Sequence, residues 1–334
     1  MTVTRDEVIW SYRAILGREP ESEDVVKIHL QSSDFPALRE SFFRSPDFIG
    51  DRALATTPLG QALLPMDLPR NEIEHDASVA QISQCLEKIR SAWSHLGITR
   101  PYFSVLTDRK FLPENLQENV DKFWASGERE AADVERILAG IGFIDLATKN
   151  CVEYGCGVGR VTTGLARRFA RVDAYDISQG HLTQAELRAQ AVGAENIFYH
   201  LCADNVLEEL TPCDFLYTKL VFQHNPPPII VQLVKRALQS LNANGIGVFQ
   251  VPTYQLGYHF KIDEWLAAAH RLDMQMHCLP QDVLFSIIAE EHCTLLSVRE
   301  DNATGEPDRF ISNTFVVRKS PLARDRSAGQ TNCA

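Results

Sequence analysis

Apolar residues follow two different spacings along the chain. From residue 82 to residue 96 they recur every three or four positions, which is the spacing of one face of an α-helix. From residue 150 onward, short apolar runs alternate with stretches of helical spacing, and this alternation predicts parallel strands joined by crossover helices. After a buried strand that begins near residue 150, we predict helices 161–169, 180–191, 228–241 and 281–291 and strands 171–176, 197–202, 213–218, 246–251, 294–300 and 311–318.

The first fifty residues predict a separate helical domain. Thr4 and Glu7 match a capping box, apolar residues continue at helical spacing to Leu16, and two more short helices are expected over 23–30 and 35–43. The next twenty-one residues contain three prolines and little periodicity, which indicates a linker. We therefore divide the chain into a helical domain (1–50), a linker (51–71), a helical extension and lid (72–140), a main domain (141–319) and a polar, disordered tail (320–334).

The composition restricts the partners of the chain. At 334 residues and 45% hydrophobic content, it is long and apolar enough for one large domain with a smaller appendage. The formal charge of −11 would repel nucleic acid over most of the surface, so we expect no nucleic-acid substrate. The eight cysteines lack C-x-x-C spacing, the N-terminus carries acids where a signal peptide has bases, and no apolar run reaches membrane-spanning length. These features predict a cytoplasmic protein without a membrane span.

A glycine-rich turn follows the strand that begins near residue 150. Glu153–Gly159 reads E-x-G-x-G-x-G, whereas a dinucleotide-binding G-x-G-x-x-G turn would need a glycine where Arg160 stands. The next predicted strand ends in Asp176, nineteen residues after Gly157. The helix start after such a turn attracts anions, and a carboxylate with two oxygens suits a ribose diol.

The turn, its spacing and the terminal acid resemble motif I of the class I S-adenosylmethionine-dependent methyltransferases. Motifs similar to that family follow in order from about Cys151 to Lys319, and Asn244-Gly245 matches the turn before the family's fifth strand. The resemblance implies an α/β fold: a seven-stranded Rossmann-like sheet with helices on both faces, closed by an antiparallel hairpin. It also implies S-adenosyl-L-methionine as the cofactor.

The resemblance further implies which residues contact the cofactor. In the family, the glycine-rich turn holds the methionine portion, here with Arg160 near its carboxylate, and Asp176 would accept hydrogen bonds from the ribose hydroxyls. Asp204 aligns with the acid that binds the adenine amino group, although helix N-capping would also explain an aspartate there. The implied cofactor-binding residues are Glu153, Gly155, Cys156, Gly157, Arg160, Asp176, Ile177, Ser178, Asp204, Asn205 and Leu220.

The segment after strand 213–218 resembles the post-strand motif of many small-molecule methyltransferases. There His224 would face the active-site mouth as a base for a hydroxyl acceptor, or would only cap the next helix. The insertion 252–280 lies where the family builds substrate specificity, and the aromatics of 102–127 belong either to a lid or to the core. The candidate acceptor-binding residues are Tyr102, Gln223, Tyr254, His259 and His277, and the sequence predicts no metal site.

Residues 12–48 are similar to a small helical domain that accompanies bacterial glycosyltransferases and methyltransferases. This resemblance favours docking of a protein partner, and a plain three-helix bundle without chemistry is the alternative. The sequence as a whole predicts O-methylation of a glycan or small-molecule hydroxyl. Three other interpretations stay open: an N-, C- or carboxyl-methyltransferase, a nicotinamide-dependent oxidoreductase, and a non-catalytic scaffold that binds the cofactor.

Overall fold

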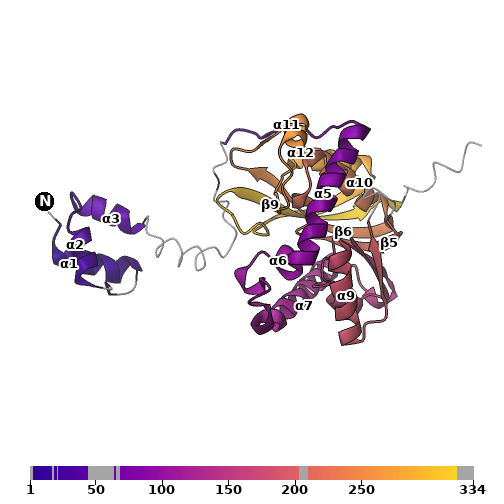
Figure 1. Ribbon diagram of the computed structural model, residues 1–334, viewed down its shortest axis with the longest axis horizontal. Coiled ribbons are helices and arrows are strands. Elements are labelled where there is room, and N and C mark those ends of the chain that lie inside the picture. The colour runs from indigo at the N-terminus through magenta and orange to yellow at the C-terminus, as the bar shows by residue number, and fades with distance from the viewer. Residues whose placement is uncertain are drawn as a thin grey trace, which may run out of the picture. The chain divides into compact units, whose positions relative to one another are not determined.

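The chain forms two compact units, residues 1–61 and 62–334 (Figure 1). The computed structural model describes residues 3–16, 19–20, 22–43, 64, 68–202 and 210–321. Most of the predicted linker, the predicted tail beyond residue 321, Asp204 and Asn205 lie outside the described residues. So do Gly17, Arg18 and residues 45–48, which belong to the segment that resembles a small helical domain.

The first unit contains the three predicted helices, α1 (Arg5–Ser11), α2 (Glu23–His29) and α3 (Phe35–Phe43). The capping box at Thr4 is confirmed, and α1 continues into a π-helical turn over Tyr12–Leu16. The helices enclose a small core of their own, made of Val3, Val8, Tyr12, Val26, Leu38 and Phe42.

The second unit is built on a seven-stranded sheet of order β4-β3-β2-β5-β6-β9-β8. All neighbouring strands from β4 to β6 pair in parallel, whereas β9 pairs antiparallel with both β6 and β8. The predicted fold class and its closing hairpin are therefore confirmed. The strands are β2 (Asn150–Tyr154), β3 (Arg171–Asp176), β4 (Ile197–Leu201), β5 (Cys213–Thr218), β6 (Leu241–Gln255), β8 (Cys293–Asp301) and β9 (Phe310–Lys319).

Helices pack on both faces of the sheet and create two apolar cores. One core joins the sheet to α5 (Val79–Thr99), α10 (Pro227–Gln239) and α12 (Gln281–Glu290). The other joins it to α7 (Leu116–Gly140), α8 (Thr162–Ala166) and α9 (Gln179–Val192). Successive residues of a strand point to opposite faces of the sheet. In β2, Val152 accordingly belongs to the first core and its neighbour Cys151 to the second.

Several elements differ from the sequence-based prediction. β6 was expected over 246–251 but spans Leu241–Gln255, because it stays paired with β9 as far as the Gln255 and Phe310 pair. The short parallel pair of β1 (Glu72–Ile73) and β7 (His259–Phe260) was not predicted, since two-residue strands have no periodicity to read. Helix α8 is also shorter than expected.

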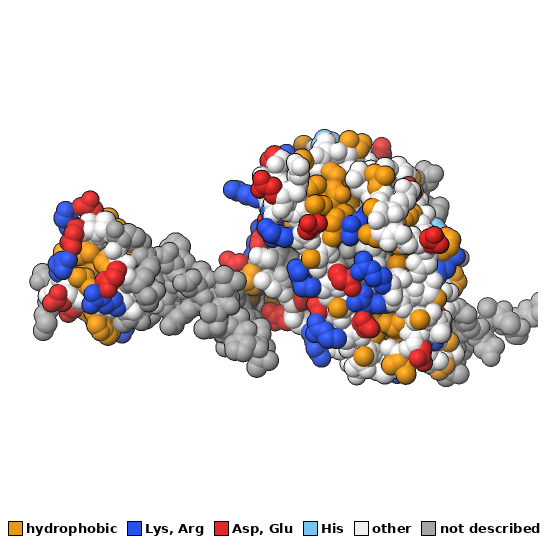
Figure 2. Space-filling model, turned by 90° about the horizontal axis from the view of Figure 1, so that it is seen from below, with side chains coloured by type: hydrophobic (Ala, Val, Ile, Leu, Met, Phe, Trp, Pro, Cys, Tyr) orange, Lys and Arg blue, Asp and Glu red, His pale blue; other side chains and the backbone are white. Residues whose placement is uncertain are grey.

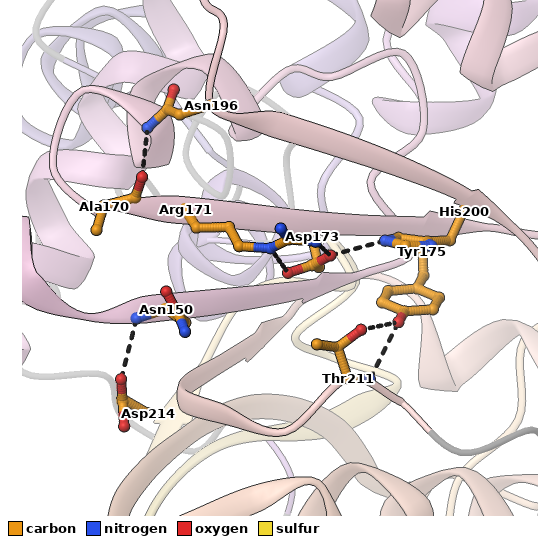
Figure 3. Close-up of polar contacts among 9 residues, drawn as sticks. All are labelled: Asn150, Ala170, Arg171, Asp173, Tyr175, Asn196, His200, Thr211 and Asp214. Carbon is orange, nitrogen blue, oxygen red and sulfur yellow. Dashed lines mark hydrogen bonds and ion pairs between the residues drawn. The ribbon is translucent and has the colours of Figure 1, made fainter.

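Polar side chains tie the parallel strands together (Figure 3). The buried Asp173 carboxylate accepts two hydrogen bonds from Arg171 at 2.7 Å and one from His200 of β4 at 2.8 Å. Burial raises the pKa of Asp173, but these partners outweigh it and hold the pKa below its ordinary value. Asp214 similarly accepts the Asn150 amide at 3.0 Å. Asp173 therefore has a structural role between strands.

Helix α5 of the extension runs across the sheet domain and makes a close contact with helix α9 (Figure 1). A Cβ atom on Gly180 of α9 would lie 2.6 Å from the Gly97 oxygen of α5, so the two backbones approach without side chains between them. Both α5 and the short helix α6 (Pro101–Val105) contact α9, and side chains of both helices line a cavity at the carboxyl ends of β2, β3 and β5. Ligands of open α/β sheets bind at that edge.

Candidate cofactor and acceptor site

A cavity lies at the carboxyl ends of β2, β3 and β5. Its floor is the turn after β2 and the ends of the neighbouring strands, and its cover comes from α5, α6 and α7. The lining includes these predicted cofactor residues: Glu153, Gly155, Cys156, Gly157, Arg160, Asp176, Ile177 and Leu220.

The glycine-rich turn is held in a conformation that side chains disfavour. Gly155, Gly157 and Gly159 have φ of +76°, +56° and +80°. A Cβ atom on Gly157 would lie 2.5 Å from Val105 Cγ2 of α6, so the cover rests directly on the bare backbone. The Gly157 amide donates to Asp176 Oδ2 at 2.9 Å, which links the turn to the end of β3.

Asp176 is buried and already orders the main chain around it. Its second oxygen, Oδ1, accepts the Ser178 amide at 2.8 Å. Each carboxylate oxygen can accept a second hydrogen bond, so capacity for a ligand remains. Ser178 itself caps α9 through the His181 amide and does not line the cavity, whereas its neighbour Ile177 does.

Arg160 forms an ion pair within the cavity that sequence reasoning missed. Its guanidinium donates to Glu130 of α7 at 2.6 Å, Lys219 Nζ lies 3.4 Å from the same carboxylate, and the Tyr217 hydroxyl donates to it. Burial raises the pKa of Glu130, but the two cations outweigh this and lower it. Arg160 and Lys219 together carry two positive charges, and Glu130 neutralises only one of them. The remaining positive charge can attract the carboxylate of a ligand.

Glu153 is a buried acid near the end of β2, just before the turn. It is 4% exposed, and its Oε2 has no hydrogen-bond partner in the described part of the chain. Burial raises the pKa of Glu153 to about 8, so the side chain holds a proton at neutral pH. An orphaned acid beside a glycine cradle fits a ligand that brings an ammonium group.

His224 lies next to this cavity at the end of a hydrogen-bond relay. The Leu220 amide donates to Gln250 Oε1 at 2.9 Å, which turns the Gln250 amide nitrogen toward Gln223 Oε1 at 3.1 Å. The Gln223 amide nitrogen then faces His224 Nε2 at 3.3 Å, and His224 Nδ1 donates to the Gln275 carbonyl at 2.9 Å. Because amides and carbonyls have fixed donor and acceptor roles, the relay fixes the neutral tautomer with its lone pair on Nε2.

The surroundings of His224 keep it neutral. Burial lowers its pKa to about 4, and its ring packs edge-on against Trp93 with 5.1 Å between centroids. A groove lined by His224 and Gln223 shares Ser104, Val105 and Leu220 with the cofactor cavity. Leu220 has φ of +61°, an unusual conformation for a branched residue and one that recurs at functional sites.

The other predicted acceptor residues are not brought together. His277 lines a second hollow with Trp93, Trp265 and His224, where burial lowers its pKa to about 3 and leaves Nε2 without a partner in the described chain. Three predicted residues lie apart from the lining of these cavities. Tyr102 packs in an apolar cluster with Phe123 and Trp124, the Tyr254 hydroxyl donates to the Pro69 carbonyl, and His259 is exposed on β7.

Sequence reasoning missed the residues that the extension supplies. Trp93, Ser104, Val105 and Glu130 line the cavity. The apolar stripe that contains Trp93 indicated only packing, and in the segment 102–127 the interpretation as a lid or as core concerned the aromatics and not Ser104 or Val105. The sequence showed on which side of its helix Trp93 lies, but not which other helix that side contacts.

In the described ranges, no group of three or more potential ligand side chains is placed to hold a metal ion. None of the helices there is long and apolar enough to cross a bilayer.

Comparisons of sequence agree with this geometry. Residues 151–245 match the profile of a family described as a methyltransferase domain. A tRNA/tmRNA (uracil-C(5))-methyltransferase from Marinomonas sp. (strain MWYL1) is 27% identical over 203 residues, which cover 58% of this chain and 50% of that protein. The chain thus spans about half the length of this curated relative.

Comparisons of structure return similar folds at low sequence identity. Magnesium protoporphyrin IX methyltransferase from Synechocystis PCC 6803, solved with bound SAM, has a TM-score of 0.49 and 14% identity, covering 73% of this chain and 100% of that one. A sarcosine dimethylglycine methyltransferase described as putative, from Galdieria sulphuraria, has a TM-score of 0.45 and 15% identity, covering 58% of this chain and 86% of that one.

Proposed function

We propose that this chain, which belongs to the class I S-adenosylmethionine-dependent methyltransferases, methylates a hydroxyl oxygen of a small molecule or glycan with His224 as the base. The relay from the Leu220 amide to the Gln275 carbonyl carries the proposal. It presents a neutral imidazole beside the cofactor cavity, with an Nε2 lone pair that accepts only the long 3.3 Å contact from the Gln223 amide. An attacking hydroxyl must take the place of that amide at Nε2 and lose its proton to it. The glycan suggestion rests on the resemblance of residues 12–48 to a domain that accompanies glycosyltransferases.

The residues of the cavity suit the cofactor that the family uses. S-adenosylmethionine supplies a methyl group on a sulfonium, which is a good leaving group. Arg160 and Lys219 would hold the carboxylate of its methionine portion, Glu153 the ammonium, and Asp176 the ribose. The remaining task of the protein is to align the acceptor oxygen, to take up its proton at His224 Nε2 and to keep water away with the α6 cover.

Methylation at a carbon of a nucleobase fits these residues less well. The curated relative is named for the C5 carbon of uracil, a carbon that needs addition of a nucleophile before it can accept a methyl group. A cysteine could serve only as a thiolate. Burial raises the pKa values of the described cysteines for which a shift is resolved: Cys85 to about 11, Cys213 and Cys278 to about 12, Cys293 to about 11, and Cys151 and Cys156 well above the ordinary value.

The surface also lacks the usual appearance of a nucleic-acid interface on the face that Figure 2 shows. Basic and acidic side chains are interspersed there, with no continuous basic stripe across the described residues. Binding of nucleic acid depends on many phosphate contacts, which a mixed surface on a chain of net charge −11 provides poorly. A hydroxyl-bearing small molecule or glycan is therefore the better candidate acceptor.

Transfer of a labelled methyl group to a panel of acceptors tests the proposal. The panel contains monosaccharides, nucleotide sugars, oligosaccharides and small hydroxylated metabolites, with tRNA as the competing class. For the acceptor found, His224→Ala should lower kcat by about 10²- to 10⁴-fold and leave the affinity for S-adenosylhomocysteine unchanged. Because the pKa of His224 is lowered to about 4, the rate should show no loss from protonation of this base between pH 7 and pH 5.

A matched control separates the base from a general effect of losing a histidine. His95→Ala makes the same change at an exposed position of α5 and should leave the rate unchanged. Full activity of His224→Ala would overturn the oxygen-acceptor mechanism and favour a nitrogen, carbon or carboxylate acceptor, for which no base is needed. Tight cofactor binding without transfer to any member of the panel would favour a non-catalytic scaffold.

A further inference from the structure

His181 stands in the cofactor cavity with one ring nitrogen unused. It lies in the first turn of α9, is 1% exposed and lines the cavity together with Asp176 and Ser104. Its Nε2 is 2.8 Å from Ser104 Oγ of α6. Its Nδ1 has no hydrogen-bond partner in the described part of the chain and lies 3.5 Å from Asp176 Oδ1, beyond ordinary hydrogen-bond length.

The proton positions around His181 follow from its neighbours. The Ser104 hydroxyl donates to the Pro101 carbonyl at 3.0 Å, an oxygen that can only accept. With its proton given to that carbonyl, Ser104 Oγ offers a lone pair to His181, and in this arrangement Nε2 carries the proton that completes the contact. Nδ1 is then left with a lone pair that points to the cavity beside Asp176.

Asp176 adds a second acceptor at the same place. Both of its oxygens accept main-chain amides, from Gly157 at 2.9 Å and from Ser178 at 2.8 Å, and these bonds fix the carboxylate. The carboxylate and the imidazole lone pair thus lie side by side with no donor between them among the described residues. Two adjacent acceptors of this kind suit a ligand that brings two adjacent donors, because an unpaired buried acceptor costs stability until it is satisfied.

We propose that His181 Nδ1 and the Asp176 carboxylate together bind the vicinal hydroxyls of the cofactor ribose, one hydroxyl each, and that Ser104 positions the imidazole for this contact. His181 is then a specificity residue for the ribose, and α6 takes part in cofactor recognition through Ser104. The inference goes beyond the acceptor chemistry, since it concerns only cofactor binding and holds whichever atom is methylated.

Calorimetric titration of the full chain with S-adenosylhomocysteine and with its 2′-deoxy and 3′-deoxy analogues tests the pairing. In the wild type, loss of either hydroxyl should weaken binding by about tenfold. In His181→Phe, loss of one of the two hydroxyls should no longer weaken binding, while loss of the other should still do so. Equal weakening of all three ligands in His181→Phe would show a purely structural role and overturn the proposal.

Two further variants sharpen this result. His95→Phe is the same substitution at an exposed position of α5 and should keep the wild-type ratios. Ser104→Ala leaves the imidazole in place but removes the group that orients it, so the same hydroxyl should lose part of its contribution. Unchanged ratios in Ser104→Ala would overturn the positioning role of this serine.

A measurement on the wild type covers the case in which His181→Phe fails to fold. In protein labelled with ¹⁵N-histidine, saturation with S-adenosylhomocysteine should shift the Nδ1 resonance of His181. The analogue without the contacting hydroxyl should leave that resonance at its free position. An Nδ1 resonance that does not move on saturation with S-adenosylhomocysteine would overturn the proposal, while transfer activity and the role of His224 would remain a separate question.

Discussion

The cofactor side and the acceptor side of the site are built from the chain in different ways. On the cofactor side, the turn after β2, the acid that ends β3 and His181 come from residues 153–181, one strand-turn-helix-strand segment and the first turn of the next helix. On the acceptor side, the surroundings of His224 come from α5, β6 and the segment 265–277, which are far apart in the sequence. The centre of the cofactor side is therefore local, although Glu130 and Lys219 join it from elsewhere in the chain, whereas the acceptor side depends on packing throughout.

The two sides also differ in whether their buried polar atoms have hydrogen-bond partners within the protein. Buried acceptors on the cofactor side, Glu153 Oε2 and His181 Nδ1, have no partner in the described chain. On the acceptor side, the relay through Gln250 and Gln223 supplies a partner for each group as far as His224, although His277 Nε2 in the adjoining hollow has none in the described part of the chain. This contrast indicates that the cofactor completes the hydrogen bonding of its own pocket, whereas the protein itself sets the protonation of the base.

The sharpest way to break the cofactor side is to fill its turn. Gly157→Ala places a Cβ atom 2.5 Å from Val105 Cγ2 in a backbone conformation of φ +56°. We expect a loss of about a hundredfold in affinity for S-adenosylhomocysteine, measured by calorimetry, because strain of about 1–3 kcal/mol adds to displacement of the cover.

The control for this prediction is Gly142→Ala. Gly142 has a similar φ of +73°, but a Cβ atom there meets nothing within 4 Å. It should lower the melting temperature through strain and leave cofactor affinity intact. Equal affinity losses in the two variants would show that backbone strain, and not contact with α6, decides binding.

A smaller effect is expected from the proton on Glu153. The pKa of this buried carboxyl is raised from 4.5 to about 8, so its favourable contribution to stability is fully present below pH 4.5 and is lost as the pH rises to 8. A bound ammonium would favour the ionised form and release the proton. The affinity for S-adenosylhomocysteine should therefore rise by up to about tenfold per pH unit as the pH approaches 8.

Glu153→Gln supplies the comparison for this measurement, because an amide has no proton to release. Its calorimetric affinity should vary less with pH than that of the wild type, and titrations in buffers of different ionisation enthalpy should show fewer protons released. A wild-type affinity that stays constant between pH 6 and pH 8 would contradict the assignment of the ammonium to this acid.

The smallest effect is expected when the first unit is removed. The residues that line the cofactor cavity lie between Ile89 and Asn225, all within the second unit. Deletion of residues 1–61 should change the affinity for S-adenosylhomocysteine by less than about twofold in the same titration. A larger loss would assign the first unit to cofactor binding and would contradict its proposed role in docking a protein partner.

Local sequence patterns predicted which segments form strands better than they predicted where each strand begins and ends. Strands 171–176 and 213–218 were predicted to the residue because each is a short segment that interrupts the regular succession of helical stretches. β6 was predicted four residues too short at its carboxyl end, since only pairing with β9 extends it to Gln255. Glu130 could not be predicted as a partner of Arg160, because the apolar spacing of α7 indicates which face is buried but not which segment that face meets.

The amino-acid sequence by itself determined the sheet, the glycine-rich turn and the acid at the end of β3, because each depends on residues within a few positions of one another. Only the tertiary structure decided which helices cover the cavity, that Arg160 is paired and that Asp176 lies beside the free nitrogen of His181. The tautomer of His224 belongs with these, since the amides that set it come from β6 and from the turn after β5. Hydrogen-bond direction and burial are properties of groups in contact, and those contacts exist only once distant segments pack together.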